Sequence, residues 1–271
     1  MYRNQNQQTL VNTLRKQNMD YKPVLHNTAS EIIELSLKKQ TDSYYQSFWK
    51  SQAWRVEETL ANLVTHLESK RKLIVDIGCN PPILLASIKN LGYQTIGLDI
   101  NPDSFREYIE QFNLSTVKCD IDNQMLPFED NSVDAIVLAE VFEHLRINPL
   151  FTLSETYRVL RPGGFLLLST PNLHSLKGIK NFLLKGNNYS CASNIFKEFN
   201  KINTIGYFGH IREYTWQEMN SLLQEIGYVE QNNIFSGGAT KNPSLAPIYS
   251  LIPTLRPVLH ILAFKPSPEK P

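Results

Sequence analysis

The sequence predicts an α/β protein in which a sheet of seven mostly parallel strands has helices on both faces. Two observations support this prediction. From residue 73 onward, short apolar runs of strand length alternate with segments of helical period. The first two of these runs each end in an acidic residue, Asp76 and Asp99. In a parallel sheet, the carboxyl ends of the strands form the edge where ligands bind.

The elements of the central region follow from this alternation. Apolar runs predict five strands, at residues 73–76, 95–99, 116–119, 135–139 and 165–170. Segments of helical period between them predict helices at residues 83–91, 103–112 and 150–160. The triplet Pro162-Gly163-Gly164 predicts a turn before the fifth strand.

The same order returns near the carboxyl end of the chain. Thr215 is a good N-cap for an amphipathic helix over residues 216–226, and Gly227 follows as a helix stop. Residues 228–235 and 258–264 are then predicted to be the sixth and seventh strands.

Four regions result from this pattern. They are an N-terminal helical extension (1–70), a ligand-binding core (71–170), a lid insertion (171–213) and the C-terminal part of the core sheet (214–271). The extension has helix-period apolar positions at 30–38 and 55–67. Between these helices lies an aromatic cluster, which consists of Tyr44, Tyr45, Phe48, Trp49 and Trp54.

Composition narrows the class of protein. The 271 residues carry a net charge of +1, so no broad basic surface favours a nucleic-acid partner. Cys79, Cys119 and Cys191 form no CxxC pair, which argues against a disulfide framework or a thiolate zinc site and favours a cytoplasmic location. The polar first twenty residues do not resemble a secretory signal.

The longest late apolar stretch, residues 245–264, is interrupted by three prolines, Arg256 and His260, so no transmembrane segment is expected. Residues 247–264 have three interpretations: a buried flap, a dimer surface or a lipid-facing edge. The buried flap is favoured because apolar tails usually end in a core. A homodimer is compatible with the sequence.

The turn after the first strand reads Asp76-Ile77-Gly78-Cys79-Asn80-Pro81-Pro82. A dinucleotide site would need three spaced glycines, because its pyrophosphate binds backbone N–H groups at a helix N-terminus. Pro81 and Pro82 remove two such donors. A P-loop is excluded because no Gly-Lys-Ser/Thr sequence is present.

This turn resembles the first motif of the class I S-adenosylmethionine-dependent methyltransferases, which have a Rossmann-like fold. Asp76 and Gly78 match the motif, while Asn80 and Pro82 stand in place of glycines. Asn80 tolerates the left-handed backbone that a glycine would supply, and Pro82 suits the first turn of the next helix. The segment 157–170 also resembles the family's helix–turn–strand, and the resemblance implies that the last strand runs antiparallel.

The resemblance also implies a cofactor site for S-adenosylmethionine. Asp99 would accept hydrogen bonds from both ribose hydroxyls, and Ile100 would pack beside the adenine. Asp120 would accept the adenine amine, and the N–H of Ile121 would reach a ring nitrogen. The backbone near Ala139 would face the methionine part. The complete expected set is Asp76, Ile77, Gly78, Cys79, Asn80, Asp99, Ile100, Asp120, Ile121, Ala139 and Glu140.

An acidic and histidine-containing cluster follows the fourth strand. Glu140, Glu143 and His144 have the spacing i, i+3 and i+4, which places them on one face if a helix begins here. His210 lies further along the chain. Quinone-biosynthesis O-methyltransferases and small-RNA 2′-O-methyltransferases have a similar pattern with a divalent metal, so these four residues are candidate ligands for an ion such as Mg²⁺.

Two other roles for this cluster stay open. His144, Glu143 and His210 are also the candidate catalytic residues, with either histidine as a general base because its ordinary pKa lies near neutrality. The cluster can also be purely structural.

The candidate substrate residues lie outside the core motifs. Tyr45 and Trp49 are expected in an aromatic lid, or alternatively in the packing of the N-terminal helices. By resemblance, Arg212 and Tyr214 would face the acceptor, although Arg212 can also simply pair with an acid.

Together these features favour methyl transfer from S-adenosylmethionine to oxygen of a small-molecule, sugar or lipid-linked acceptor. One alternative is a metal-dependent RNA 2′-O-methyltransferase, which the near-zero net charge disfavours. The other is a non-catalytic, methyltransferase-like binding protein, supported only by Asn80 and Pro82 in place of glycines.

Overall fold

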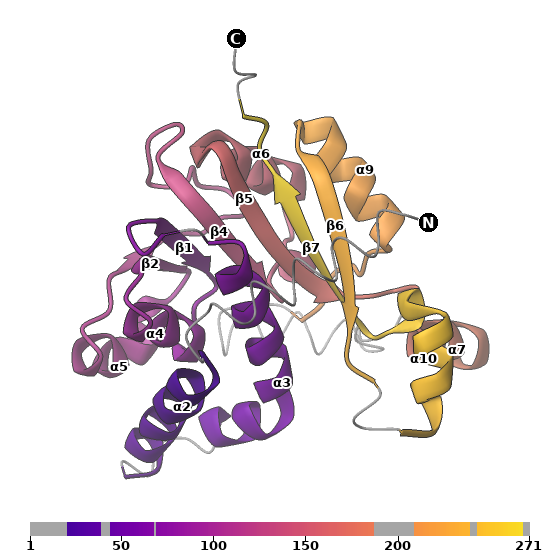
Figure 1. The fold of residues 1–271 in the computed structure, drawn as a ribbon, viewed down its shortest axis with the longest axis horizontal. Coiled ribbons are helices and arrows are strands. Elements are labelled where there is room, and N and C mark those ends of the chain that lie inside the picture. Colours follow the sequence, from indigo (N-terminus) through magenta and orange to yellow (C-terminus); the bar gives the residue numbers. More distant parts are fainter. Residues whose placement is uncertain (1–20, 39–43, 68, 187–208, 239–242, 268–271) are drawn as a thin grey trace. The chain divides into compact units, whose positions relative to one another are not determined.

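The computed structural model describes residues 21–38, 44–67, 69–186, 209–238 and 243–267. The chain divides into two compact units, residues 1–117 and 118–271. Figure 1 shows the helices and strands of each unit.

Seven strands form one sheet in the order β3-β2-β1-β4-β5-β7-β6. Within the first unit β1 and β2 are parallel, and within the second β4 and β5 are parallel. The last strand, β7, runs antiparallel to both of its neighbours, β5 and β6. The predicted seven-stranded, mostly parallel sheet with an antiparallel last strand is therefore confirmed. The strands are β1 (Leu73–Ile77), β2 (Gln94–Asp99), β3 (Thr116–Lys118), β4 (Val133–Ala139), β5 (Leu160–Pro171), β6 (Val229–Ser236) and β7 (Val258–Phe264).

The first unit joins its parallel strands through one apolar helix. Ile74 and Val75 of β1 are fully buried, and α4 buries six of its eight residues, as expected for a crossover helix against a sheet. Its helices are α2 (Tyr21–Lys38), α3 (Tyr44–Thr65), α4 (Ile83–Asn90), η1 (Pro102–Phe105) and α5 (Arg106–Gln111).

The N-terminal helices are longer than predicted. Helix α3 begins at Tyr44, so the aromatic cluster forms the first half of this helix and does not separate two helices. Trp49 lies edge-on to His26 of α2, with 5.5 Å between ring centroids. Several of these aromatic residues are exposed or only partly buried, so they do not mark one buried face of the helix. The helical period was therefore not visible in this part of the sequence.

In the second unit the predicted turn at Pro162-Gly163-Gly164 is instead an irregularity inside β5. The strand starts at Leu160, and its register against β4 shifts between Val133 and Ala135. A Cβ atom on Gly164 would lie 2.8 Å from the carbonyl oxygen of Asp134. Glycine is therefore required where the two strands approach each other.

Helices α6 and α9 of the second unit match the predictions closely, whereas α7 and α10 were not predicted. Helix α9 covers the predicted residues, and Thr215 forms a capping box with Glu218. Gly227 ends the helix in the left-handed conformation. The helices of this unit are η2 (Phe142–His144), α6 (Pro149–Val159), α7 (Leu176–Lys185), α9 (Trp216–Ile226), η3 (Pro243–Leu245), α10 (Ala246–Leu251) and η4 (Pro253–Leu255).

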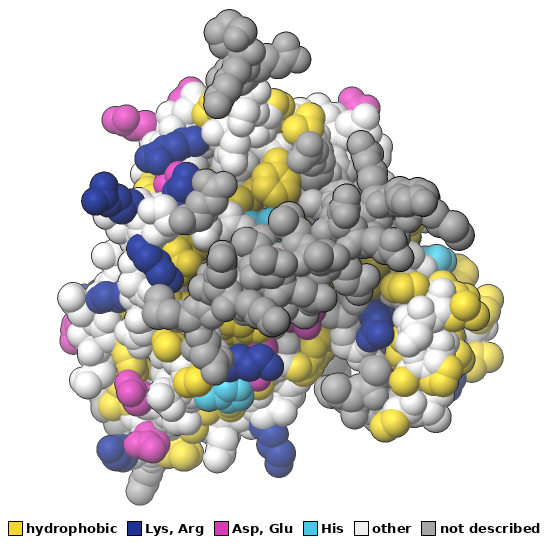
Figure 2. Space-filling view, viewed as in Figure 1, with side chains coloured by type: hydrophobic (Ala, Val, Ile, Leu, Met, Phe, Trp, Pro, Cys, Tyr) yellow, Lys and Arg dark blue, Asp and Glu magenta, His cyan; other side chains and the backbone are white. Residues whose placement is uncertain are grey.

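The C-terminal apolar segment is only partly a buried flap. Strand β7 is almost entirely buried, as favoured from the sequence, but Leu251 is 83% exposed. Hydrophobic side chains gather in Figure 2 at the lower right, where Figure 1 places α10 and α7. Most of the expected lid insertion, residues 187–208, lies outside the described residues. None of the described helices is both long and apolar enough to cross a lipid bilayer.

Arg158 links α6 to the loop before β4. Its guanidinium donates to both carboxylate oxygens of Glu155, to Asp130 and to the carbonyl oxygens of Phe128 and Leu126, at 2.7–3.0 Å. These bonds raise the pKa of the guanidinium, chiefly through Glu155. All five donors are therefore used to hold one loop against one helix.

Replacing Arg158 with methionine is expected to lower the free energy of unfolding by about 2–4 kcal/mol, because it leaves the largely buried Glu155 without its cation. Chemical denaturation measures this change. The control, Arg106→Met, breaks an exposed pair with Asp103 and should change stability by less than about 0.5 kcal/mol. Equal effects of the two substitutions would contradict the prediction.

Candidate functional site

The turn after β1 is hydrogen-bonded to the end of β2. The backbone N–H groups of Gly78 and Cys79 both donate to the carbonyl oxygen of Leu98, at 2.8 and 3.4 Å. Gly78 has φ +74°, a conformation that glycine adopts without strain. The turn therefore folds back over the strand that ends in Asp99.

Gly97 allows this close approach. A Cβ atom at position 97 would lie 2.6 Å from Sγ of Cys79 and 2.7 Å from a methyl carbon of Leu85. Cys79 is almost completely buried, and its sulfur lies against Gly97. Neither role could be read from the motif, because the close contact joins residues of two strands.

Asp99 is positioned by backbone donors from two segments. Its Oδ1 accepts a hydrogen bond of 2.8 Å from the N–H of Asn101. Burial raises the pKa of this carboxyl, and hydrogen bonds from the backbone N–H groups of Asn101, Asn80 and Ile100 oppose the rise. Asp99 thus holds the turn after β1 as well as its own strand end.

Asn80 does not have the left-handed backbone expected from the sequence. Among the described non-glycine residues, only Asn113, Asn131 and Glu140 have positive φ, and Asn80 precedes Pro81 across a cis peptide bond. Oδ1 of Asn80 accepts a hydrogen bond of 2.9 Å from the hydroxyl of Tyr45 in α3. The side chain at position 80 therefore fastens the turn to the N-terminal extension.

Pro82 lies at the N-cap of α4, one residue before the expected first turn of the helix. Its position agrees with the tolerance of helix N-termini for proline. The departures from the glycine pattern are thus accommodated by side-chain and helix-end geometry.

Asp76 carries the most strongly perturbed carboxyl of the turn. It is 3% exposed, and burial, with a contribution from the charge of Asp99, raises its pKa to about 8. Two acidic groups share this small region, and each makes ionisation of the other more costly. A ligand that donates hydrogen bonds or carries positive charge would relieve this cost.

In the second unit, the residues after β3 form a tight turn. Asp120 accepts hydrogen bonds from the N–H of Asp122 and from the side chain of Asn123, both at 3.2 Å. Ile121 is buried, and its carbonyl oxygen accepts from the hydroxyl of Thr152 in α6 at 2.8 Å. The turn is therefore well ordered before any ligand arrives.

Asp122 is a structural residue of this region that the sequence motif did not indicate. Its buried carboxylate accepts backbone hydrogen bonds from Arg146, Ile147 and Asn148, at 2.7, 2.9 and 3.2 Å. Arg146 also lies 3.6 Å from it as an ion pair. Asp122 thus fixes the loop that follows η2, and only the three-dimensional fold brings these donors together.

The predicted helical face beginning at Glu140 is wrong. Glu140 has φ +57°, and its N–H donates to the carbonyl oxygen of Ser169 at 2.9 Å, which extends the β4–β5 pairing past Ala139. A single 3-10 turn, η2, follows at Phe142–His144. Oε1 of Glu140 accepts from the hydroxyl of Ser169 at 3.2 Å, and Glu140 is not part of the cluster described next.

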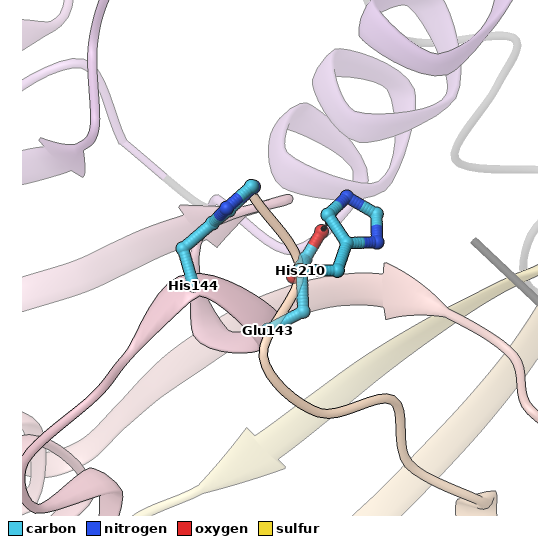
Figure 3. Close-up of side chains that lie close together, drawn as sticks. All are labelled: Glu143, His144 and His210. Carbon is cyan, nitrogen blue, oxygen red and sulfur yellow. Dashed lines mark ion pairs between the residues drawn. The ribbon is translucent and has the colours of Figure 1, made fainter. Parts of the chain in front are cut away.

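Glu143, His144 and His210 come together, with one ligand atom from each residue lying within 4.8 Å of the others. Figure 3 shows Glu143 and His144 on η2 and His210 on the segment that passes beside it. The two imidazole rings are edge-on, with 4.8 Å between centroids. The backbone N–H of Ile211 donates to the carbonyl oxygen of Glu143 at 2.8 Å, which fixes this juxtaposition.

The carboxylate of Glu143 is almost completely buried, and only one of its two oxygens accepts a hydrogen bond from the described residues. Its Oε2 accepts a hydrogen bond of 3.1 Å from the hydroxyl of Thr170. Its Oε1 lies 3.9 Å from Nε2 of His210 and accepts no hydrogen bond from the described residues. Nδ1 of His210 lies 3.5 Å from Glu213, so the ring sits between two carboxylates. This arrangement suits a metal ligand set or a base with an acidic partner.

Arg212 and Tyr214 have clear partners. Arg212 forms an ion pair of 2.7 Å with Glu218, and its guanidinium lies 4.8 Å from the ring centroid of Tyr214. The ring of Tyr214 is buried against Phe142, and burial raises the pKa of its hydroxyl. Contact of these residues, or of Tyr45 and Trp49, with an acceptor stays a prediction.

Sequence comparison places this geometry in a known context. Residues 75–168 match the family model of the methyltransferase domain. A probable S-adenosylmethionine-dependent methyltransferase of Mycolicibacterium smegmatis is 30% identical over 127 residues, which cover 47% of this chain and 47% of that protein. A ubiquinone biosynthesis O-methyltransferase of Xanthomonas campestris is 24% identical over 167 residues, covering 56% of this chain and 66% of that protein. The chain thus spans about half to two thirds of these relatives.

Structural comparison agrees on the fold. A crystal structure of an S-adenosylmethionine-dependent methyltransferase from Archaeoglobus fulgidus has a TM-score of 0.57 and 19% identity. The similarity covers 83% of this chain and all of that one. At this identity the likeness supports the Rossmann-like fold alone. With the domain match, it confirms the resemblance to class I methyltransferases.

Replacing Asp76 with asparagine is expected to flatten the pH dependence of stability. The folded protein holds the Asp76 proton up to a pKa of about 8, whereas the ordinary value is 3.8. Between these values the folded state binds more protons, so stability falls as pH rises, by up to about 1.4 kcal/mol per pH unit. Urea denaturation across this range, with exposed Asp103→Asn as control, measures the slope. An unchanged slope in Asp76→Asn would refute the assignment.

Proposed function

We propose, from the premise that residues 75–168 are a methyltransferase domain, that this protein transfers a methyl group from S-adenosylmethionine to an acceptor oxygen. The observation that supports this most directly is the turn after β1, folded over β2 with the carboxylates of Asp76 and Asp99. These two acids, with Asp120 and the backbone of Ile121, are proposed to bind the cofactor.

The residues of the first unit would hold the ribose. Asp99 already orders the backbone of Asn80 and Ile100, so its remaining acceptor capacity is available for ribose hydroxyls. Backbone of the Gly78 turn can approach a ligand closely because no Cβ intervenes. Bound S-adenosylmethionine supplies an electrophilic methyl group on a positively charged sulfur.

The catalytic contribution of the protein would be alignment and removal of one proton. His210 or His144 would accept the proton of the acceptor hydroxyl as its oxygen forms the bond to the methyl carbon. The carbon–sulfur bond breaks in the same step, and its electron pair neutralises the sulfur. Glu143, whose Oε1 faces His210 at 3.9 Å, would stabilise the protonated imidazole.

The proposed acceptor class rests on sequence similarity and on residues outside the core motifs. The similarity to a ubiquinone biosynthesis O-methyltransferase supports methylation on oxygen. The lid insertion at 171–213, together with Arg212 and Tyr214, is proposed to shape a pocket for a small-molecule, sugar or lipid-linked acceptor. The aromatic residues Tyr45 and Trp49 of the first unit are also proposed to contact the acceptor.

Replacing Asp99 with asparagine is expected to weaken binding of S-adenosylhomocysteine by roughly 10- to 100-fold, because it removes a charged acceptor of hydroxyl hydrogen bonds. Isothermal titration calorimetry measures this affinity. The matched control, Asp103→Asn on the neighbouring η1, should leave the affinity unchanged. Absence of cofactor binding by the unmodified protein would reject the proposed function.

A divalent metal among Glu143, His144 and His210 is a second element of this proposal. The buried Oε1 of Glu143, with no hydrogen-bond donor among the described residues, and the mixed oxygen and nitrogen donors fit such an ion. When bound, the ion would supply Lewis-acid activation of an acceptor hydroxyl. Glu140 is left out of this ligand set because its side chain is held by Ser169. A metal-dependent RNA methyltransferase is the alternative, and a gel shift with RNA separates the two acceptors.

If the ion is present, Glu143→Gln is expected to weaken Mn²⁺ or Mg²⁺ binding at least tenfold in calorimetry, because it removes the charged ligand. Chelation should then abolish methyl transfer, and added metal should restore it. His66→Ala, at the residue that follows α3 and lies outside the cluster, serves as control. Full activity after chelation, with a pH profile that His210→Ala shifts, would assign the cluster to general-base catalysis instead.

A further inference from the structure

Five large apolar side chains are exposed on helices α7 and α10 of the second unit, and a sixth, Ile252, directly follows α10. Leu183 and Leu184 near the end of α7 are 74% and 72% exposed, and Leu251 at the end of α10 is 83% exposed. The set, called here the α7–α10 face, consists of Phe182, Leu183, Leu184, Ile248, Leu251 and Ile252. Single exposed apolar residues are common, but a concentration of this kind marks an interaction surface.

The two helices are attached to the same end of the sheet. Pro171 at the end of β5 pairs with Val258 at the start of β7, so α7 begins and α10 ends close to one strand junction. The side chain of Asn172 donates to the carbonyl oxygens of Thr254 and Arg256, both at 2.8 Å. The segment before α7 is thereby fixed to the segment after α10. Figures 1 and 2 show both helices, and the apolar side chains over them, in one part of the second unit.

Helix α7 is held at its start and projects at its end. Ser175 caps the helix by accepting from the N–H of Gly178 at 3.0 Å, and Gly178 is buried. In contrast, every residue from Phe182 to Gly186 is exposed. The helix therefore presents its last turn outward on a fixed base.

The charged residues within the two segments that carry this face have one sign. Helix α7 carries Lys177, Lys180 and Lys185, and Arg256 follows α10. Neither residues 171–186 nor residues 243–257 contain an acid, although the chain has 26 acidic residues against 27 basic ones. An apolar surface with lysines at its border is complementary to an anionic, partly apolar partner.

We propose that the α7–α10 face docks onto an anionic membrane surface. The leucine, isoleucine and phenylalanine side chains enter the boundary between headgroups and acyl chains, and the lysines contact anionic headgroups. A symmetric dimer through this face would place two sets of lysines opposite each other, which is unfavourable. A partner protein with a groove for a single amphipathic helix would cover either α7 or α10, and the apolar residues of the uncovered helix would stay exposed. The inference is independent of the proposed methyl transfer.

Sedimentation of the full chain with lipid vesicles tests the proposal. Binding is expected to vesicles of phosphatidylcholine with roughly one-third phosphatidylglycerol, at least tenfold above binding to phosphatidylcholine alone, and to weaken with added salt. The double variant Leu183→Glu, Leu184→Glu should lower the partition coefficient roughly tenfold or more. Lys180→Gln with Lys185→Gln should do so by roughly tenfold and reduce the salt dependence.

Matched controls separate docking from folding. Leu37→Glu on α2 alters an exposed leucine elsewhere, and Lys50→Gln with Lys118→Gln removes two exposed lysines elsewhere. Both controls should bind vesicles like the unmodified protein. Because all of these side chains are exposed, none of the substitutions is expected to disrupt the fold. Thermal unfolding of every variant checks this. Vesicle binding needs neither cofactor nor acceptor, so its failure is distinct from failure of the proposed function.

Two results would overturn the proposal. The first is no binding to the anionic vesicles, or binding that the Leu183→Glu, Leu184→Glu variant retains in full. The second is self-association of the unmodified protein in analytical ultracentrifugation that this variant abolishes, because the face would then be covered by a second copy of the chain.

Discussion

The hydrogen bond from Gly78 to the carbonyl oxygen of Leu98 is the interaction on which the candidate cofactor site depends. It folds the turn after β1 over the end of β2 and brings the backbone of Asn80 within reach of the Asp99 carboxylate. Burial raises the pKa of both carboxyls, and the charge of Asp99 raises the pKa of Asp76 further. The shape of the candidate cofactor site and the free-energy cost of ionising Asp76 and Asp99 therefore have the same structural cause.

Elements with local signals could be predicted from the sequence to within a few residues. Helix α9 and strand β7 match at both ends, because Thr215 and Gly227 define the ends of the helix and an apolar run broken only by His260 defines the strand. The acids at the tips of β1 and β2 likewise indicated the candidate cofactor site. These features depend on neighbours in the chain, which a sequence displays directly.

Features that depend on distant partners could not be predicted. Glu140 was expected to begin a helical face, but its N–H is taken by Ser169 across the sheet, which forces a positive φ. Asp122 gave no signal because its three backbone donors come from a loop more than twenty residues away. The Glu143–His210 approach was foreseen by resemblance alone, since no spacing rule joins residues so far apart.

The burial of Cys79 has a chemical consequence for the proposed binding of a methyl sulfonium. A thiolate beside such a group would be a competing nucleophile and would become alkylated itself. Burial, with the charges of Asp76 and Asp99, raises the pKa of the Cys79 thiol well above its ordinary value, so the sulfur stays protonated and shielded. The absence of a side chain at Gly97, which makes room for this sulfur, thereby protects the turn against self-inactivation.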